Sequence, residues 1–165
     1  MDFGILLASI IFGFLGVYIF SKSFKKIVLK EYESGLLYKN GKFKKLLGAG
    51  RYWTNGWTTE ITRVDGRLKT DTIPGQEVLT QDQVGLKISI GIQYQIENPE
   101  KAFHISESYF NDLYQTSQLA LRSIVGNQKI EDLLENRTAI GTALLEMVTS
   151  DAEKIGLKIH RIDIK

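Results

Sequence analysis

The chain has 165 residues, a formal net charge of +2 and no cysteine, so it has room for one globular domain with a short appendage and not for a second full domain. The lack of cysteine excludes disulfides, a thiol nucleophile and any cysteine-ligated zinc or iron–sulfur site. The basic charge is concentrated in residues 21–51, which hold nine basic and two acidic residues, whereas the remainder is mildly acidic.

The first predicted element is a membrane-spanning helix over residues 3–20, "FGILLASIIFGFLGVYIF", which contains no charge and no proline. As a helix it would reach roughly 27 Å, close to the ~30 Å hydrocarbon core of a bilayer. Its Ile, Leu, Phe and Val side chains favour insertion by about 5 kcal/mol in sum. The apolar side chains of this span are Phe3, Ile5, Leu6, Leu7, Ile10, Ile11, Phe12, Phe14, Leu15, Val17, Tyr18, Ile19 and Phe20.

A cleaved signal peptide and a buried core helix are the alternatives for this segment. A signal peptide has a basic start and a small-x-small cleavage site, yet only Met1 and Asp2 precede the run and "YIFSKSFKK" follows it. A core helix would show polar residues at helical spacing, which are missing here. We therefore expect a membrane anchor over residues 1–21.

A basic juxtamembrane segment is predicted at residues 22–30, directly behind the apolar run. The positive-inside rule then places the following domain in the cytoplasm. The lysines would also attract an anionic leaflet by about 1 kcal/mol each, unless they serve only as a topology signal. They are Lys22, Lys25, Lys26 and Lys30.

Strands dominate the next part of the chain. Residues 36–47 centre on Asn40-Gly41, the dipeptide that favours a type I′ turn, and so predict a β-hairpin. Further strands are predicted at residues 59–70 and 76–80. The run 84–96, "VGLKISIGIQYQI", alternates apolar and polar side chains without an error, which is typical of a strand with one dry and one wet face. The first half therefore predicts an antiparallel meander.

The apolar period changes to a helical one at Asn98-Pro99. A short helix is expected directly after it, followed by helices over 107–125 and 130–155, the latter with Met147 in its apolar stripe and each with a glycine at its end. The last nine residues return to strand spacing, with a bulge near His160 or Arg161. This order predicts an α+β fold in which helices cover one face of an antiparallel sheet.

The chain offers no recognisable catalytic pattern. His104 and His160 belong to no paired metal motif, and no GxSxG occurs. The glycines of "GAGRYWTNG" precede a strand rather than a helix and fit turns better than a phosphate loop. We therefore predict no catalytic, cofactor-binding or metal-ligating residue, and expect the protein not to be an enzyme.

Two polar features remain as candidate binding surfaces. Basic and aromatic residues alternate from Tyr38 to Trp53, a pattern that suits nucleic acid or lipid headgroups; its place behind a membrane span favours headgroups, so no nucleic-acid partner is expected. Asp65 and Arg67 would share one strand face, as a structural ion pair or a contact to a neighbouring subunit. Asp82 is grouped with them as a possible subunit contact.

Several segments in order carry a family resemblance: "ESGLLYKNGKFKKLLGAGRYW", "ITRVDGRLKTDTIPGQEVLTQDQVGLKISIGIQYQIENPEKA", "LALRSIVGNQKIEDLLENRTAIG" and "GLKIHRIDIK". The chain resembles the superfamily of stomatin, prohibitin, flotillin and HflK/HflC, the SPFH or Band 7 domain, and among its branches the bacterial stomatin-like slipins. On this resemblance, residues 31–165 form the SPFH domain.

The resemblance implies a non-enzymatic membrane scaffold without cofactors. Such proteins form homo-oligomers, organise lipid and protein microdomains in the cell membrane, and pair with membrane proteases or NfeD-type proteins. Family members normally continue past the "IDIK" position into a long coiled-coil helix, and this sequence ends there. We expect either a truncated form or oligomers weaker than usual for the family.

Two rival functions stay open from the sequence. One is a membrane-tethered hydrolase or protease subunit that uses His104 or His160. The other is a secreted binding domain released by signal cleavage. The leading hypothesis is a single-pass cell-membrane protein whose SPFH domain, on the cytoplasmic side, acts as an oligomeric scaffold that binds lipids and copies of itself.

Overall fold

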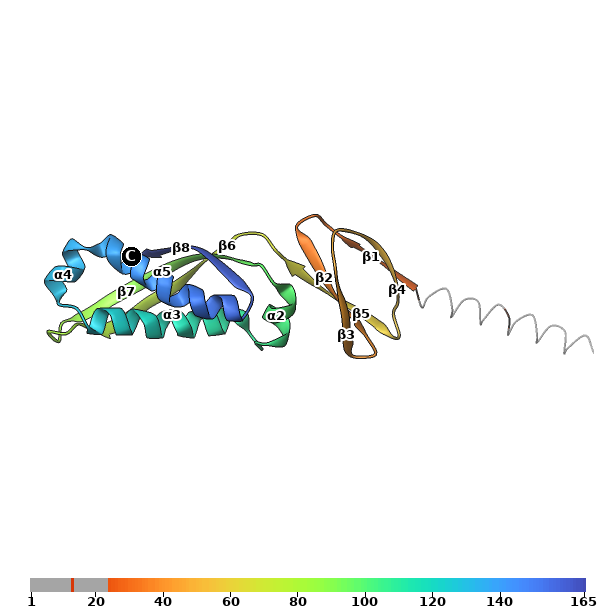
Figure 1. The fold of residues 1–165 in the computed structure, drawn as a ribbon. Coiled ribbons are helices and arrows are strands. Elements are labelled where there is room, and N and C mark those ends of the chain that lie inside the picture. The colour runs from red at the N-terminus through yellow and green to blue at the C-terminus, as the bar shows by residue number, and fades with distance from the viewer. Residues whose placement is uncertain (1–12, 14–23) are drawn as a thin grey trace, which may run out of the picture. The chain divides into compact units, whose positions relative to one another are not determined.

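The computed structural model describes residue 13 and residues 24–165. Apart from Gly13, the predicted span at residues 3–20 lies outside this part of the chain, as does Lys22. Within the described part, no helix has the length and apolar character needed to cross a membrane. The chain divides between Val64 and Asp65 into two compact units, which Figure 1 shows.

Five strands build the first unit, and their pairing differs from the predicted meander. β1 pairs antiparallel with β4, and a second sheet has the order β3-β2-β5, so strands that follow one another in sequence are not always neighbours. β1 itself lies within the predicted juxtamembrane segment. The bounds are β1 Phe24–Leu29, β2 Glu33–Lys39, β3 Lys42–Leu47, β4 Gly50–Asn55 and β5 Thr59–Asp65.

The predicted hairpin at residues 36–47 is confirmed as β2 and β3. Asn40 and Gly41 both have positive φ, 52° and 75°, which is the requirement of a type I′ turn. One position further from the turn on each strand, Tyr38 and Phe43 pair edge to face with ring centroids 5.9 Å apart. This aromatic pair supports the register next to the turn.

In the core of the first unit, side chains pack closely against the backbone of Gly35. Leu29, Leu36 and Leu47 are buried. A Cβ added at Gly35 would stand 2.7 Å from Leu29 Cδ1 and 3.0 Å from Ile61 Cγ2. A side chain at position 35 would therefore force the Leu29 and Ile61 side chains to move, which favours glycine there.

The strand predicted at residues 59–70 is wrong in its second half, because β5 ends at Asp65 and a new strand, β6 (Lys69–Leu79), begins after a turn. The Asp65 carboxylate accepts the Arg67 backbone N–H at 3.0 Å, which closes the turn. The predicted strand at 76–80 is the end of β6, which continues past Pro74 through a bulge between Ile73 and Gln76. Proline has no N–H to donate, and β6 is an edge strand where that loss is tolerated.

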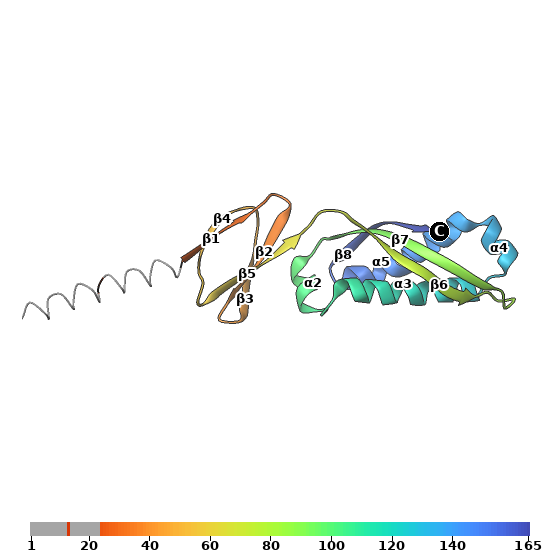
Figure 2. The same ribbon diagram turned by 180° about the vertical axis from the view of Figure 1, so that it is seen from behind.

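The second unit consists of an antiparallel sheet of order β6-β7-β8 and four helices. In the second half of β7 (Gly85–Ile96) the predicted dry positions Ile90, Ile92, Tyr94 and Ile96 are buried. The prediction is wrong for Val84, which precedes the strand and is 39% exposed, and Leu86 and Ile88 are only partly buried. Figures 1 and 2 show α3 (Tyr109–Gly126) and α5 (Arg137–Lys154) along the same side of this sheet. The α+β fold with helices on one sheet face is thus confirmed for this unit, while the single predicted sheet is replaced by three sheets in the described chain.

The last strand, β8 (Leu157–Ile164), has the predicted bulge. Gln93 pairs with Arg161 and Tyr94 with Ile159, so His160 is the extra residue. The strand follows Gly156, whose φ of +77° ends α5 as expected for a left-handed terminating glycine.

The helix predicted over residues 130–155 is wrong as one element, because it breaks at Asn136. The Asn136 N–H donates to Asp132 O and closes α4 (Ile130–Glu135), while its own carbonyl accepts the Ala139 N–H at the start of α5. Met147 is 46% exposed rather than part of the core. The shorter helices are α4 and α2 (Pro99–His104). α2 begins after Asn98 as predicted, and the Asn98 side chain caps it by accepting the Lys101 N–H.

Candidate functional site

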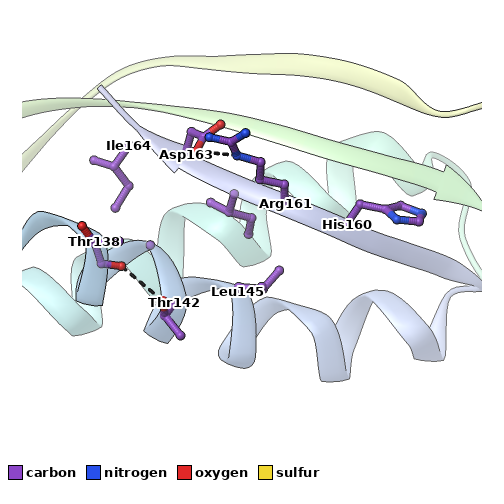
Figure 3. A pocket seen from close by; sticks show the side chains of 9 residues that line it. Thr138, Thr142, Leu145, His160, Arg161, Asp163 and Ile164 are labelled. Atoms are coloured by element: carbon purple, nitrogen blue, oxygen red, sulfur yellow. Dashed lines mark hydrogen bonds and ion pairs between the residues drawn. The ribbon is translucent and has the colours of Figure 1, made fainter.

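A hollow of about 410 Å³ lies between α5 and β8. Figure 3 shows Thr138, Thr142 and Leu145 on the helix side and the β8 residues from His160 onward on the strand side. The Thr142 hydroxyl donates to the Thr138 carbonyl at 3.2 Å, and Arg161 Nε donates to Asp163 Oδ1 at 2.8 Å. Each of these two contacts stays within its own element, and neither pairs a nucleophile with a base.

The two histidines lie on separate elements. His104 ends α2 and His160 is the bulged residue of β8. Among residues 13 and 24–165, no three His, Asp or Glu side chains are grouped so that they could hold a metal ion. The structure therefore adds no observation in favour of the hydrolase hypothesis.

Asp65 and Arg67 form a two-pronged ion pair across the β5–β6 turn. Arg67 Nη2 lies 2.6 Å from Asp65 Oδ2, and Nε lies 3.0 Å from Oδ1. The sequence interpretation as an ion pair is confirmed, but its basis is wrong, because the two residues flank a turn and do not share a strand. A contact to a neighbouring subunit stays a prediction.

The same ion pair predicts an acid-shifted titration. The hydrogen bonds from the Arg67 side chain and then its backbone N–H lower the pKa of Asp65 from 3.8 to about 2. Because the folded pKa is the lower one, the stabilisation is present above pH 3.8 and is lost as the pH falls toward 2. A carbon-13 NMR titration of the Asp65 carboxyl should show a midpoint near 2, and Arg67→Gln should raise it; an unshifted midpoint would contradict the pairing.

Asp82 has partners inside its own chain. Its Oδ1 accepts the Thr80 hydroxyl at 2.5 Å and the Ile130 backbone N–H at 3.3 Å. The Thr80 hydrogen bond is the main reason why the pKa of Asp82 is lowered. Asp82 thus ties the β6–β7 turn to the first turn of α4, where a carboxylate is favoured; its role as a subunit contact stays a prediction.

Two polar contacts between β6 and its neighbours were missed by sequence reasoning. The buried Tyr94 hydroxyl donates to Asp71 Oδ2 at 2.9 Å, and burial together with this carboxylate raises the pKa of Tyr94. Gln76, at the bulge, donates to the Tyr114 hydroxyl of α3 at 3.2 Å. The sequence holds one signal for the Tyr94–Asp71 contact, which is a tyrosine within an otherwise aliphatic dry face. A buried hydroxyl needs a hydrogen-bond partner.

The predicted basic and aromatic surface lies in the first unit. On β1, Lys26 pairs with Trp53 and Val28 with Arg51, so Phe24, Lys26 and Val28 share one face with the two β4 side chains. Phe24, Val28 and Trp53 are exposed on this face. Lys25 is on the other face of β1 and Lys30 lies just after it. A hollow of about 310 Å³ nearby is lined partly by Lys39, Lys44, Lys45, Tyr52 and Trp53.

These features define a class of protein: an α+β fold, with a sheet backed by two helices and a small β unit that exposes basic and aromatic side chains. The model of the family described as "SPFH domain / Band 7 family" matches residues 27–165. The chain therefore belongs to the Band 7 family, as its motifs predicted. Particular similarity to the slipins stays a prediction.

Curated relatives agree with this assignment. An uncharacterized protein of Archaeoglobus fulgidus is 32% identical over 141 residues, which cover 84% of this chain and 55% of that protein. A stomatin homologue of Pyrococcus horikoshii is 28% identical over 92% of this chain and 56% of its own length. Stomatin-2 of Caenorhabditis elegans is 25% identical over 84% of this chain and 37% of its own. The chain thus spans about half the length of the first two of these relatives and less of the third.

Proposed function

We propose that this protein is a non-enzymatic membrane scaffold, anchored by residues 3–20, whose Band 7 domain of residues 31–165 associates with copies of itself and with membrane proteins. The observation that carries the proposal is the Band 7 match over residues 27–165, together with stomatins among the similar proteins. Membrane proteases and NfeD-type proteins are the partner classes we propose, and lipid microdomains the structures it organises.

The physical support comes from sequence and surface together. The apolar run at residues 3–20 has the length of a bilayer crossing. The unit that follows it exposes Phe24, Val28 and Trp53 beside lysines, a composition suited to a headgroup region. The Arg161–Asp163 strand edge beside the α5–β8 hollow provides a surface on which a second copy could pack.

Membrane fractionation with crosslinking tests the proposal. The full chain should stay in membranes after an alkaline carbonate wash, because an apolar span resists removal, and should leave them only with detergent. An amine-reactive crosslinker applied to intact membranes should yield a ladder of multimers. Recovery in the soluble fraction, or a single monomeric band at native expression, would contradict it.

We propose the cytoplasmic side for the Band 7 domain, on the basis of Lys22, Lys25, Lys26 and Lys30 behind the span. The chain has no cysteine of its own, so Asn40→Cys introduces a unique thiol at an exposed turn. A membrane-impermeant thiol reagent should label it only after the cells are opened. Labelling of intact cells would place the domain on the other side.

A further inference from the structure

One end of the first unit brings together the entry of the chain and two turns. Phe24, the first residue of β1, pairs with Asn55, the last residue of β4. The turn at residues 55–58 is joined to the β2–β3 turn, because the Asn40 N–H donates to the Thr58 carbonyl at 2.8 Å. We call Phe24, residues 39–42 and residues 55–58 the loop end; its strands can be followed in Figure 1.

Trp57 is the most exposed large hydrophobic side chain of the described residues, at 79%. Its backbone is fixed, since the Trp57 N–H donates to Asn55 Oδ1 at 3.1 Å and the Thr58 N–H to the Asn55 carbonyl at 3.3 Å. The turn therefore holds the indole out to the surroundings, next to the strand end where Phe24 is 45% exposed. Indole rings in such a position suit the boundary between water and lipid.

The charge at the loop end is unfavourable for the unit on its own. Lys39 and Lys42 stand directly opposite each other across the hairpin, and like charges in that position destabilise a strand pair. The loop end itself contains no acidic residue, and Glu60 is the acidic side chain that lines the hollow between the two turns. An anionic surface would relieve this repulsion.

The sequence limits how far the loop end can lie from a membrane. The apolar run ends at Phe20, four residues before Phe24. Four residues of fully extended chain reach at most ~14 Å, and the headgroup region adds roughly 5 to 8 Å on each side of the hydrocarbon core. If residues 3–20 cross the bilayer, the loop end is within reach of the headgroups.

We propose that the loop end docks onto the membrane, with Trp57 and Phe24 among the headgroups of an anionic phospholipid leaflet and Lys39 and Lys42 on the phosphates. This rests on the proposed membrane anchoring. The docking gives the first unit a further attachment to the leaflet. It acts in addition to the anchor at residues 3–20 and to the lysines before and within β1.

Quenching of tryptophan fluorescence tests the docking, because the chain contains only Trp53 and Trp57. The full chain is reconstituted in phosphatidylcholine and phosphatidylglycerol vesicles with brominated acyl chains. Trp53→Phe leaves Trp57 as the probe. Trp57→Phe leaves Trp53, a matched control that is also exposed but is paired with Lys26, about 7 Å further along the strands. We expect at least twofold stronger quenching of Trp57; equal quenching, or none with vesicle-bound chain, would overturn the proposal.

Charge variants distinguish docking through the loop end from a general attraction of basic side chains to an anionic membrane. Lys39→Gln with Lys42→Gln should weaken docking roughly fivefold per lysine in phosphatidylglycerol vesicles, seen as a loss of Trp57 quenching. The control pair, Lys44→Gln with Lys45→Gln, removes the same charge farther from the turn and should have a smaller effect. Equal effects of both pairs would overturn the assignment to the loop end.

The failure of this inference differs from a failure of the proposed function. A chain that does not float with vesicles contradicts membrane anchoring and with it both proposals. A chain that floats but keeps Trp57 unquenched contradicts only the docking. A change of Trp57 emission with an oligonucleotide and none with lipid would assign the loop end to nucleic acid and overturn the docking.

Discussion

Gly156→Ala should destabilise the second unit by about 3 kcal/mol or more, because it combines a strained backbone with a collision. Gly156 has a φ of +77°, which side chains with a Cβ rarely adopt. A Cβ there would stand 2.4 Å from the Asn98 carbonyl oxygen and 2.9 Å from Lys101 Cβ. The Gly156 carbonyl also accepts the Glu97 and Asn98 N–H groups at 3.0 Å each, so any shift of the backbone disturbs the β7–α2 connection.

Urea unfolding of the detergent-solubilised chain, followed by the helix signal in circular dichroism, measures this effect. Apart from Gly13, every described helix lies in the second unit. The proposed span at residues 3–20 should keep its helix in detergent, so the part of the signal that changes with urea reports on the second unit. The control is Gly91→Ala in the centre of β7, where a Cβ would meet only Asp163 atoms at 3.8 and 3.9 Å. We expect the control to change stability by no more than about 0.5 kcal/mol. Similar midpoints for both variants would contradict the collision.

Leu121→Ala should lower the free energy of unfolding of the same unit by roughly 3 to 4 kcal/mol. Leu121 is fully buried, at 0% exposure, on the face of α3 that packs toward α5 and the sheet. Truncation removes apolar contacts and leaves a cavity that the surrounding helices and strands fill only in part.

Leu119→Ala is the matched control, since it makes the same change two residues away on the same helix. Leu119 is 65% exposed, and its truncation should change stability by about 0.5 kcal/mol or less. Tryptophan fluorescence serves as a second check that the effect is confined to the second unit, because both tryptophans belong to the first unit and report on its unfolding. A larger effect of Leu119→Ala than of Leu121→Ala would mean that the helix faces the other way.

Two aspartates stabilise turns at the ends of strands. Asp65 closes the β5–β6 turn with Arg67, and Asp82 joins the β6–β7 turn to α4. Both carboxylates accept a backbone N–H group, Asp65 that of Arg67 and Asp82 that of Ile130. Their effect within the chain is established by these contacts, and it would remain if either residue also met a neighbouring subunit.

Much of the local structure was determined by the sequence alone, because turn hydrogen bonds and the side-chain period depend on residues that are close together in the chain. Asn40-Gly41 specified the hairpin through its positive φ values. The alternation within residues 84–96 specified the buried face of β7 from Ile90 to Ile96. Asn98-Pro99 and Gly156 specified where helices begin and end, and ordered motifs over the chain specified the Band 7 family.

The pairing of distant segments was decided only by the tertiary structure. No local pattern states that Phe24 pairs with Asn55 rather than with the neighbouring β2, nor that Asn40 bonds to Thr58. The break at Asn136 was hidden because the apolar period continues across it, while the carbonyl of Asn136 begins a new helix. The loop end with Trp57 follows from such non-local contacts: the sequence supplies the residues, and strand pairing places them together.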